Sequence, residues 1–127
     1  MTFLGLLAVC AGAATGASLR WWLALALNPV FPTLPLGTLA ANCAGGYLIG
    51  LVLGALPHFE ALSPDVRLMV TTGFLGGLTT FSTFSAEAAM LISRNQLGWA
   101  ALHISGHLAG SLIMTFAGIA TLRPLLR

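Results

Sequence analysis

The sequence has very few charged residues. Only 6% of its 127 residues are Asp, Glu, Lys or Arg, whereas 57% are hydrophobic, and the mean hydropathy is +0.95. All five cations are arginines, which lie singly along the chain and leave a net charge of +2. A soluble domain of this size cannot bury so much apolar surface, and scattered arginines do not form a nucleic-acid-binding surface. The composition therefore predicts an integral protein of the lipid bilayer, with no nucleic acid as partner.

Cysteines and catalytic motifs are also scarce. Cys10 and Cys43 both lie in apolar segments, which favours two small core residues over a disulfide. The sequence contains no phosphate-binding loop of the type G-x-x-x-x-G-K-[ST] and no grouping of a nucleophile, an acid and a base. We therefore do not expect an enzyme.

Four apolar segments are long enough to cross a bilayer, and they end at prolines, arginines or short polar loops. Their approximate ranges are 2–27, 36–56, 64–93 and 98–122. Glycines spaced four apart on three of them are typical of closely packed membrane helices: Gly12 and Gly16; Gly46, Gly50 and Gly54; Gly106 and Gly110. We expect an all-α integral membrane fold, in which residues 1–127 form one domain of four transmembrane helices.

The third segment is too long for a straight transmembrane helix. A helix over residues 64–94 would measure about 46 Å, against a hydrocarbon core of about 30 Å. The run GFLGGLTTFSTFS, from Gly73 to Ser85, lies in its middle, and each glycine costs about 1 kcal/mol relative to alanine. We therefore expect a broken third helix. Close helix packing is the alternative explanation of the run, but a break leaves peptide groups that can hold an ion.

The arginines give almost no bias in orientation. One side of the membrane would hold Arg67, Arg123 and Arg127, and the other would hold Arg20 and Arg94. Either the orientation is fixed by another feature or the protein inserts both ways. Four short helices are too few to enclose a pathway and also shield a broken helix. Two opposite orientations would build an antiparallel homodimer with two-fold symmetry.

Polar side chains recur at steps of four residues on the last three segments, so each set lies on one helix face. Hydrogen bonding between helices would explain any one set, but three sets together favour an ion pathway. The sets are Thr38 and Asn42; Thr79, Thr83 and Glu87; and His103, His107, Ser111 and Thr115.

The charged and titratable residues of the apolar segments need separate interpretations. Glu87 is either an interfacial residue opposite Arg94 or part of the pathway. His103 and His107 have the spacing of two metal ligands, but no Cys, Asp or Glu lies nearby in the sequence to complete a tetrahedral set, so we expect no metal there. Arg20 precedes two tryptophans, which is typical of an interfacial anchor.

The polar sets consist mainly of hydrogen-bond donors, namely hydroxyls, an amide and imidazoles. A buried anion is very unfavourable unless such donors replace its water. Aromatic ring edges are also electropositive, and Phe81 and Phe84 can present theirs to a shared seam. The sequence therefore favours a small anion as the permeating species.

Three motifs resemble those of the CrcB/Fluc family of bacterial fluoride channels. They are GTLAAN over residues 37–42, GGYLIG over residues 45–50 and the run over residues 73–85. Residues 19–21 and 110–112 extend the resemblance to the first and fourth segments. It implies a dual-topology antiparallel homodimer of the bacterial inner (cell) membrane, with two pores that passively export fluoride and relieve its toxicity.

The resemblance also implies roles for individual residues. Phe81 and Phe84 would form an aromatic box, and backbone carbonyls of Gly76 and Thr79 would hold a structural Na⁺ on the dimer axis. The pore would be lined by Thr38, Asn42, Thr83 and Ser111, with His103, His107 and Glu87 as a further polar track and Arg20 as a charge at the mouth.

One residue departs from the family pattern, because some relatives carry a tyrosine where this chain has His103. Protonation of His103 and of His107, one turn later, is expected to alter conduction at low pH. Fluoride efflux at acid and neutral pH from a His103→Gln, His107→Gln variant tests this expectation.

Two rival interpretations remain. A small multidrug exporter would need a carboxylate in the first helix, and residues 2–27 contain none. A non-conducting assembly subunit would explain the glycines and leave the polar sets unexplained.

Overall fold

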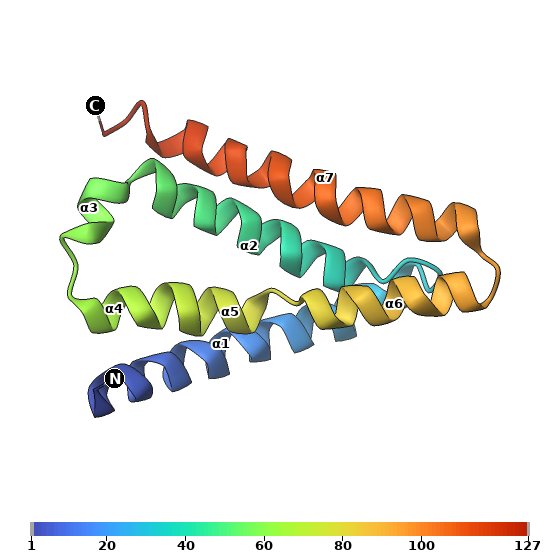
Figure 1. Ribbon diagram of the computed structural model, residues 1–127, viewed down its shortest axis with the longest axis horizontal. Coiled ribbons are helices and arrows are strands. Elements are labelled where there is room, and N and C mark those ends of the chain that lie inside the picture. Colours follow the sequence, from blue (N-terminus) through green and yellow to red (C-terminus); the bar gives the residue numbers. More distant parts are fainter. Residues whose placement is uncertain (1, 127) are drawn as a thin grey trace.

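The computed structural model describes residues 2–126, and every regular element in that range is helical (Figure 1). The long helices are α1 (Phe3–Leu27), α2 (Leu36–Gly54) and α7 (Leu97–Leu122). Each of these is long and apolar enough to cross a membrane. The predicted all-helical class is therefore confirmed.

The chain between α2 and α7 forms shorter helices. After α3 (Leu56–Glu60), Ser63 caps the next helix by accepting a hydrogen bond from the Val66 amide. The elements that follow are α4 (Pro64–Leu68), the π-helical turn η2 (Met69–Leu75), α5 (Gly76–Leu78) and α6 (Phe81–Ser93). In Figure 1 this run and α1 point one way, whereas α2 and α7 point the other way.

Helical geometry stops between α5 and α6. Thr79 (φ −84°, ψ 154°) and Thr80 (φ −150°, ψ 117°) are extended, and Figure 1 shows them as a thin link between the two helices. Gly76 and Gly77 lie three and two residues before Thr79 and weaken the helix through their backbone freedom. The break therefore lies inside the run over residues 73–85.

Two close helix contacts hold the chain together, namely α2 against α7 and α1 against η2 and α5. Glycines make them possible. A Cβ added at Gly50 would overlap the Thr115 carbonyl, and one added at Gly16 would overlap the Phe74 carbonyl. Close backbone approach at small residues is how helices associate in a membrane, where no hydrophobic effect drives them together.

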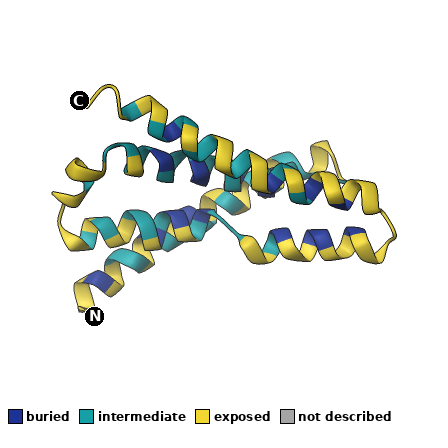
Figure 2. Cartoon of the chain, turned by 45° about the horizontal axis from the view of Figure 1, so that its top comes forward, coloured by how far each residue is buried: buried dark blue, intermediate teal, exposed yellow. Residues whose placement is uncertain are grey.

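The outer faces of the helices carry large exposed apolar side chains. Figure 2 shows exposed residues along every long helix, with the buried residues on the sides that face other helices. Trp21 and Trp22 on α1 and Phe116 on α7 are each at least 60% exposed. Such a surface suits a hydrocarbon surrounding, because lipid solvates apolar side chains and water does not.

Candidate functional site

The side chain of Asn42 on α2 satisfies the backbone at the break. Its Oδ1 accepts a hydrogen bond from the Thr80 amide at 2.8 Å, and its Nδ2 donates to the Thr80 carbonyl at 3.1 Å. The Thr80 amide would otherwise lack a helical partner, which is costly away from water, whereas the Thr80 carbonyl is also the N-cap acceptor of α6. Asn42 therefore stabilises the interruption.

Thr80 also begins α6. Its Oγ1 accepts from the Thr83 amide at 3.1 Å and lies 3.0 Å from the Thr83 hydroxyl. This is the usual N-cap arrangement, in which a threonine oxygen satisfies one of the free amides in the first helical turn. Sequence reasoning did not single out Thr80; the signal that could have found it is the preference for threonine at the first position before a helix.

Arg20 connects α1 to the end of α5. Its Nε donates to the Gly77 carbonyl at 2.9 Å, whereas Trp21 and Trp22 are exposed. A helix that ends early leaves carbonyls without intrahelical donors, and a cation is favourable at that end. The tryptophans fit the expected interfacial anchor, but the arginine contacts the region of the break.

Replacing Arg20 with methionine is expected to lower the free energy of unfolding by about 1–2 kcal/mol, because a partly exposed, charged hydrogen bond to Gly77 is lost. Thermal unfolding of the purified protein measures the effect as a lower midpoint. Arg94→Met, at an exposed turn residue, is the matched control. Equal midpoints for the two variants would contradict a stabilising role for the Arg20 contact.

A groove with a volume of about 590 Å³ lies beside the break. It is mostly apolar, and α2, α5, α6, α7 and η2 all contribute to it. Seven of the residues predicted for the site line it: Asn42, Gly76, Thr79, Phe81, Phe84, His107 and Ser111. The structure thus brings together side chains that lie far apart in the sequence.

The two phenylalanines of the groove differ in exposure. Phe81 is 76% exposed and Phe84 is 8% exposed, and their ring centroids lie 5.4 Å apart at an interplanar angle of 57°. Phe84 also packs against His103, with ring centroids 5.3 Å apart, and against His107, at 4.8 Å. Phe84 and His107 therefore form the part of the groove lining that adjoins a buried polar cluster.

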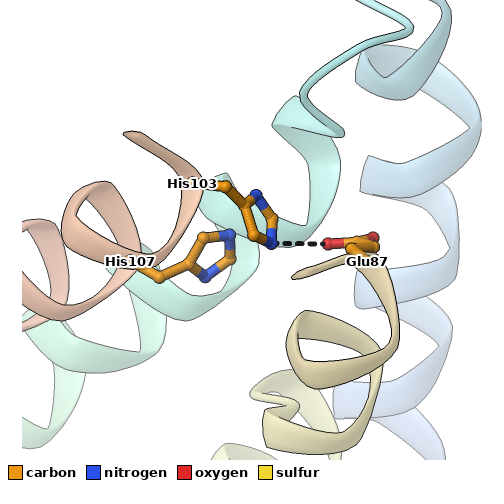
Figure 3. Close-up of side chains that lie close together, drawn as sticks. All are labelled: Glu87, His103 and His107. Atoms are coloured by element: carbon orange, nitrogen blue, oxygen red, sulfur yellow. Dashed lines mark ion pairs between the residues drawn. The ribbon is translucent and has the colours of Figure 1, made fainter. Parts of the chain in front are cut away.

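That buried cluster consists of Thr38, Glu87, His103 and His107 (Figure 3 draws the last three). The Thr38 hydroxyl donates to Glu87 Oε1 at 2.6 Å, and Glu87 Oε2 lies 3.5 Å from His103 Nε2. His107 Nδ1 lies 3.1 Å from Asn42 Nδ2. The cluster is thus joined to the break through Asn42.

Comparison with known proteins identifies the family of the chain. A family described as CrcB-like protein, Camphor Resistance (CrcB), matches residues 7–119. The chain belongs to the CrcB family. The resemblance found in the sequence motifs is therefore confirmed.

Several CrcB-family relatives are similar along nearly their whole length. The fluoride-specific ion channel FluC of Nitrosospira multiformis is 57% identical over 123 residues, covering 97% of this chain and 96% of the relative. The channel of the same name from Aromatoleum aromaticum is 59% identical, covering 90% of this chain and 87% of the relative. The one from Chromobacterium violaceum is 55% identical, covering 91% of this chain and 92% of the relative. Together with the apolar helices, these relatives identify the chain as a membrane protein.

In this CrcB-family chain, the structure bears on two interpretations of the sequence. Of the two alternatives left open for Glu87, it excludes the position opposite Arg94, because the carboxylate contacts Thr38 and His103 inside the protein. It also brings a third candidate metal ligand to His103 and His107, because Glu87 on α6 lies beside both histidines of α7 although it is distant from them in the sequence.

The predicted pore residues fall into two groups. Asn42, Phe81, Phe84 and Ser111 line the groove. Thr38 and Thr83 lie outside its lining and act within the protein, Thr38 by binding Glu87 and Thr83 by joining the Thr80 cap.

Proposed function

We propose that the chain is a fluoride-specific ion channel that lets fluoride leave the cell passively and so relieves fluoride toxicity. The names of the relatives support this function, and so does the groove beside the helix break. The observation that carries the proposal is the meeting of Asn42, Ser111 and the two phenylalanines in that groove. No energy source is needed, because an anion that leaves a negative-inside cell gains about 2.3 kcal/mol per 100 mV.

The groove suits a small anion that must lose its water. A dehydrated anion needs hydrogen-bond donors or the positive edges of aromatic rings in place of solvent. The Ser111 hydroxyl and the edges of Phe81 and Phe84 are of these kinds, the Asn42 amide holds the backbone beside them, and the lining includes no carboxylate. We therefore assign the aromatic pair and the two polar residues to the fluoride pathway.

We further propose four membrane crossings, with Pro64–Ser93 as a single broken helix. The run from α4 to α6 extends alongside the three long helices in Figure 1, and the four alternate in direction. Asn42 and Arg20 supply partners for backbone groups at the break, which lipid cannot provide.

Two copies in opposite orientations would complete the pathway, as an antiparallel homodimer of the bacterial inner membrane. The balance of arginines supports dual topology. The groove opens at a surface where Phe81 is largely exposed, so a second copy would cover it and supply the missing wall. Such an arrangement gives two equivalent pathways by symmetry.

The backbone at the break fits a structural Na⁺. Because the Thr80 amide bonds Asn42, it does not donate to the Gly76 carbonyl as it would in a continuous helix. Gly76 is exposed and Thr79 is extended. Carbonyl oxygens are ligands of alkali cations at broken membrane helices. Gly76 and Thr79 from two copies would therefore hold Na⁺ on the dimer axis, where it would link the subunits.

Fluoride efflux from liposomes tests the proposed function. Vesicles containing the purified protein are expected to release fluoride on addition of a potassium ionophore, and chloride-loaded vesicles are expected to behave like protein-free ones. A fluoride electrode and a chloride electrode give the two rates. Equal release of both anions contradicts selectivity, and no release of either favours a non-conducting subunit.

A further inference from the structure

Three groups that bind metals converge in the buried cluster. One ligand atom from each of Glu87, His103 and His107 lies within 4.8 Å of the others, and each residue is no more than 8% exposed (Figure 3). The two histidines are one turn apart on α7, and the glutamate comes from the neighbouring α6. The set is therefore held by two packed helices.

Two polar atoms of the cluster lack the partners that buried atoms normally have. Within residues 2–126, Glu87 Oε2 and His107 Nε2 accept or donate no hydrogen bond. Most buried side-chain polar atoms in native proteins do have a partner, so an unpaired one calls for an explanation. Both atoms belong to the residues that converge, and a shared ligand would satisfy them together.

We propose that Glu87, His103 and His107 form a transition-metal site within each chain, of the kind that binds Zn²⁺. Two imidazoles and one carboxylate are a donor set that zinc uses, with bonds of about 2 Å and a further position for an exogenous ligand. Mg²⁺ and Ca²⁺ prefer oxygen ligands, so the two imidazoles disfavour them. Donor atoms around tetrahedral zinc lie about 3.3 Å apart, so small side-chain movements close the site.

Neighbouring residues orient the ligands of the site. Thr38 donates to Glu87 Oε1, which fixes the carboxylate, and Oε2 accepts no hydrogen bond but lies 3.5 Å from His103 Nε2. Phe84 packs against both imidazole rings and restricts their rotation. Partners that fix ligating side chains in this way strengthen metal binding.

Metal binding competes with one hydrogen bond at the break. The Thr80 amide fixes the orientation of the Asn42 side chain, so Asn42 Nδ2 donates to His107 Nδ1 and the ring proton lies on Nε2. A metal ion at Nε2 requires the other tautomer, in which the proton moves to Nδ1. His107 then no longer accepts from Asn42, so the metal site and the break are coupled.

The consequence for conduction rests on the proposed function. His107 lines the groove together with Asn42 and Phe84, so an ion that enters the groove can reach the site. A bound divalent cation would hold both rings and weaken the contact that positions Asn42. Zn²⁺ is therefore expected to slow fluoride efflux.

Direct binding tests the site without any transport measurement. Protein purified without a histidine tag is titrated with Co²⁺, whose visible absorption reports a tetrahedral site, and with Zn²⁺ in equilibrium dialysis. We expect one ion per chain. His107→Gln and Glu87→Gln should each weaken binding about tenfold or more. His58→Gln and Glu60→Gln make the same changes at exposed positions on α3 and should leave binding unchanged.

Two outcomes would overturn the site. They are half an ion per chain, which indicates ligands shared between subunits, and equal losses of affinity in the His58 and His107 variants.

Fluoride efflux with and without Zn²⁺ then tests the coupling. Inhibition of the parent but not of His107→Gln supports it, and binding without inhibition refutes it. If the protein binds Zn²⁺ but releases no fluoride, the metal site is supported and the proposed channel function is wrong.

Discussion

Replacing Asn42 with leucine is expected to reduce fluoride efflux to the level of protein-free liposomes. Leucine has a similar size but neither accepts from the Thr80 amide nor donates to the Thr80 carbonyl. The Thr80 amide, left without a partner, would cost about 1–3 kcal/mol, so the extended link would change its conformation or become disordered. The fluoride electrode assay gives the efflux rate directly.

Gln96→Leu is the matched control for this variant. It also replaces an amide side chain with leucine, but at an exposed residue in the turn between α6 and α7. We expect efflux close to that of the parent protein. If Asn42→Leu conducted as fast as Gln96→Leu, another group would have to satisfy the Thr80 backbone, and the assigned role of Asn42 would be wrong.

The main features of the helices could be predicted from the sequence because they depend on local properties. Apolar length defines a segment that can cross a bilayer, and α1, α2 and α7 end close to the predicted limits. Glycine and hydroxyl residues weaken a helix wherever they occur, so the run over residues 73–85 indicated where regular geometry would stop. The family resemblance depended on the same short motifs.

The partners of the polar side chains could not be predicted in the same way. Spacing by four residues shows that His103 and His107 share a face of their helix, but it does not show which helix that face meets. From the sequence, Glu87 could lie at the membrane interface opposite Arg94 or inside the protein, and only packing of α6 against α7 decides between these positions. The contact between Arg20 and Gly77 joins residues 57 positions apart, and no local pattern indicates it.

The glycine pattern shows the same limit on the last helix. Gly106 and Gly110 were predicted as a packing pair, but a Cβ at Gly106 would meet nothing within 4 Å in residues 2–126. Gly118, which no spacing rule selected, lies against the backbone of Tyr47 and Gly50 instead. Spacing identifies residues that can pack closely, whereas the tilt and rotation of the two helices decide which ones do.

Gly118→Val is therefore expected to prevent correct folding. A Cβ at this position would overlap the Tyr47 carbonyl, and a Cβ at Gly50 would approach the Gly118 Cα to 3.0 Å, so the α2 and α7 backbones are in close contact here. Overpacking by flexible side chains typically costs about 1–3 kcal/mol, and rigid backbone atoms yield less easily. That cost is a large part of a typical stability of about 5–15 kcal/mol. Size-exclusion chromatography and thermal unfolding would detect aggregation or a much lower midpoint.

Gly98→Val provides the comparison on the same helix, because a Cβ there meets nothing within 4 Å among the described residues. Both variants replace a glycine of α7 with valine, so a much larger loss of stability in the Gly118 variant reports packing against α2. The Gly98 variant should be monodisperse and unfold near the parent temperature. Separation of α2 from α7 would also move Asn42 away from His107, so we expect the Gly118 variant to lose conduction together with stability. Similar midpoints for the two variants would mean that α2 and α7 do not touch at Gly118.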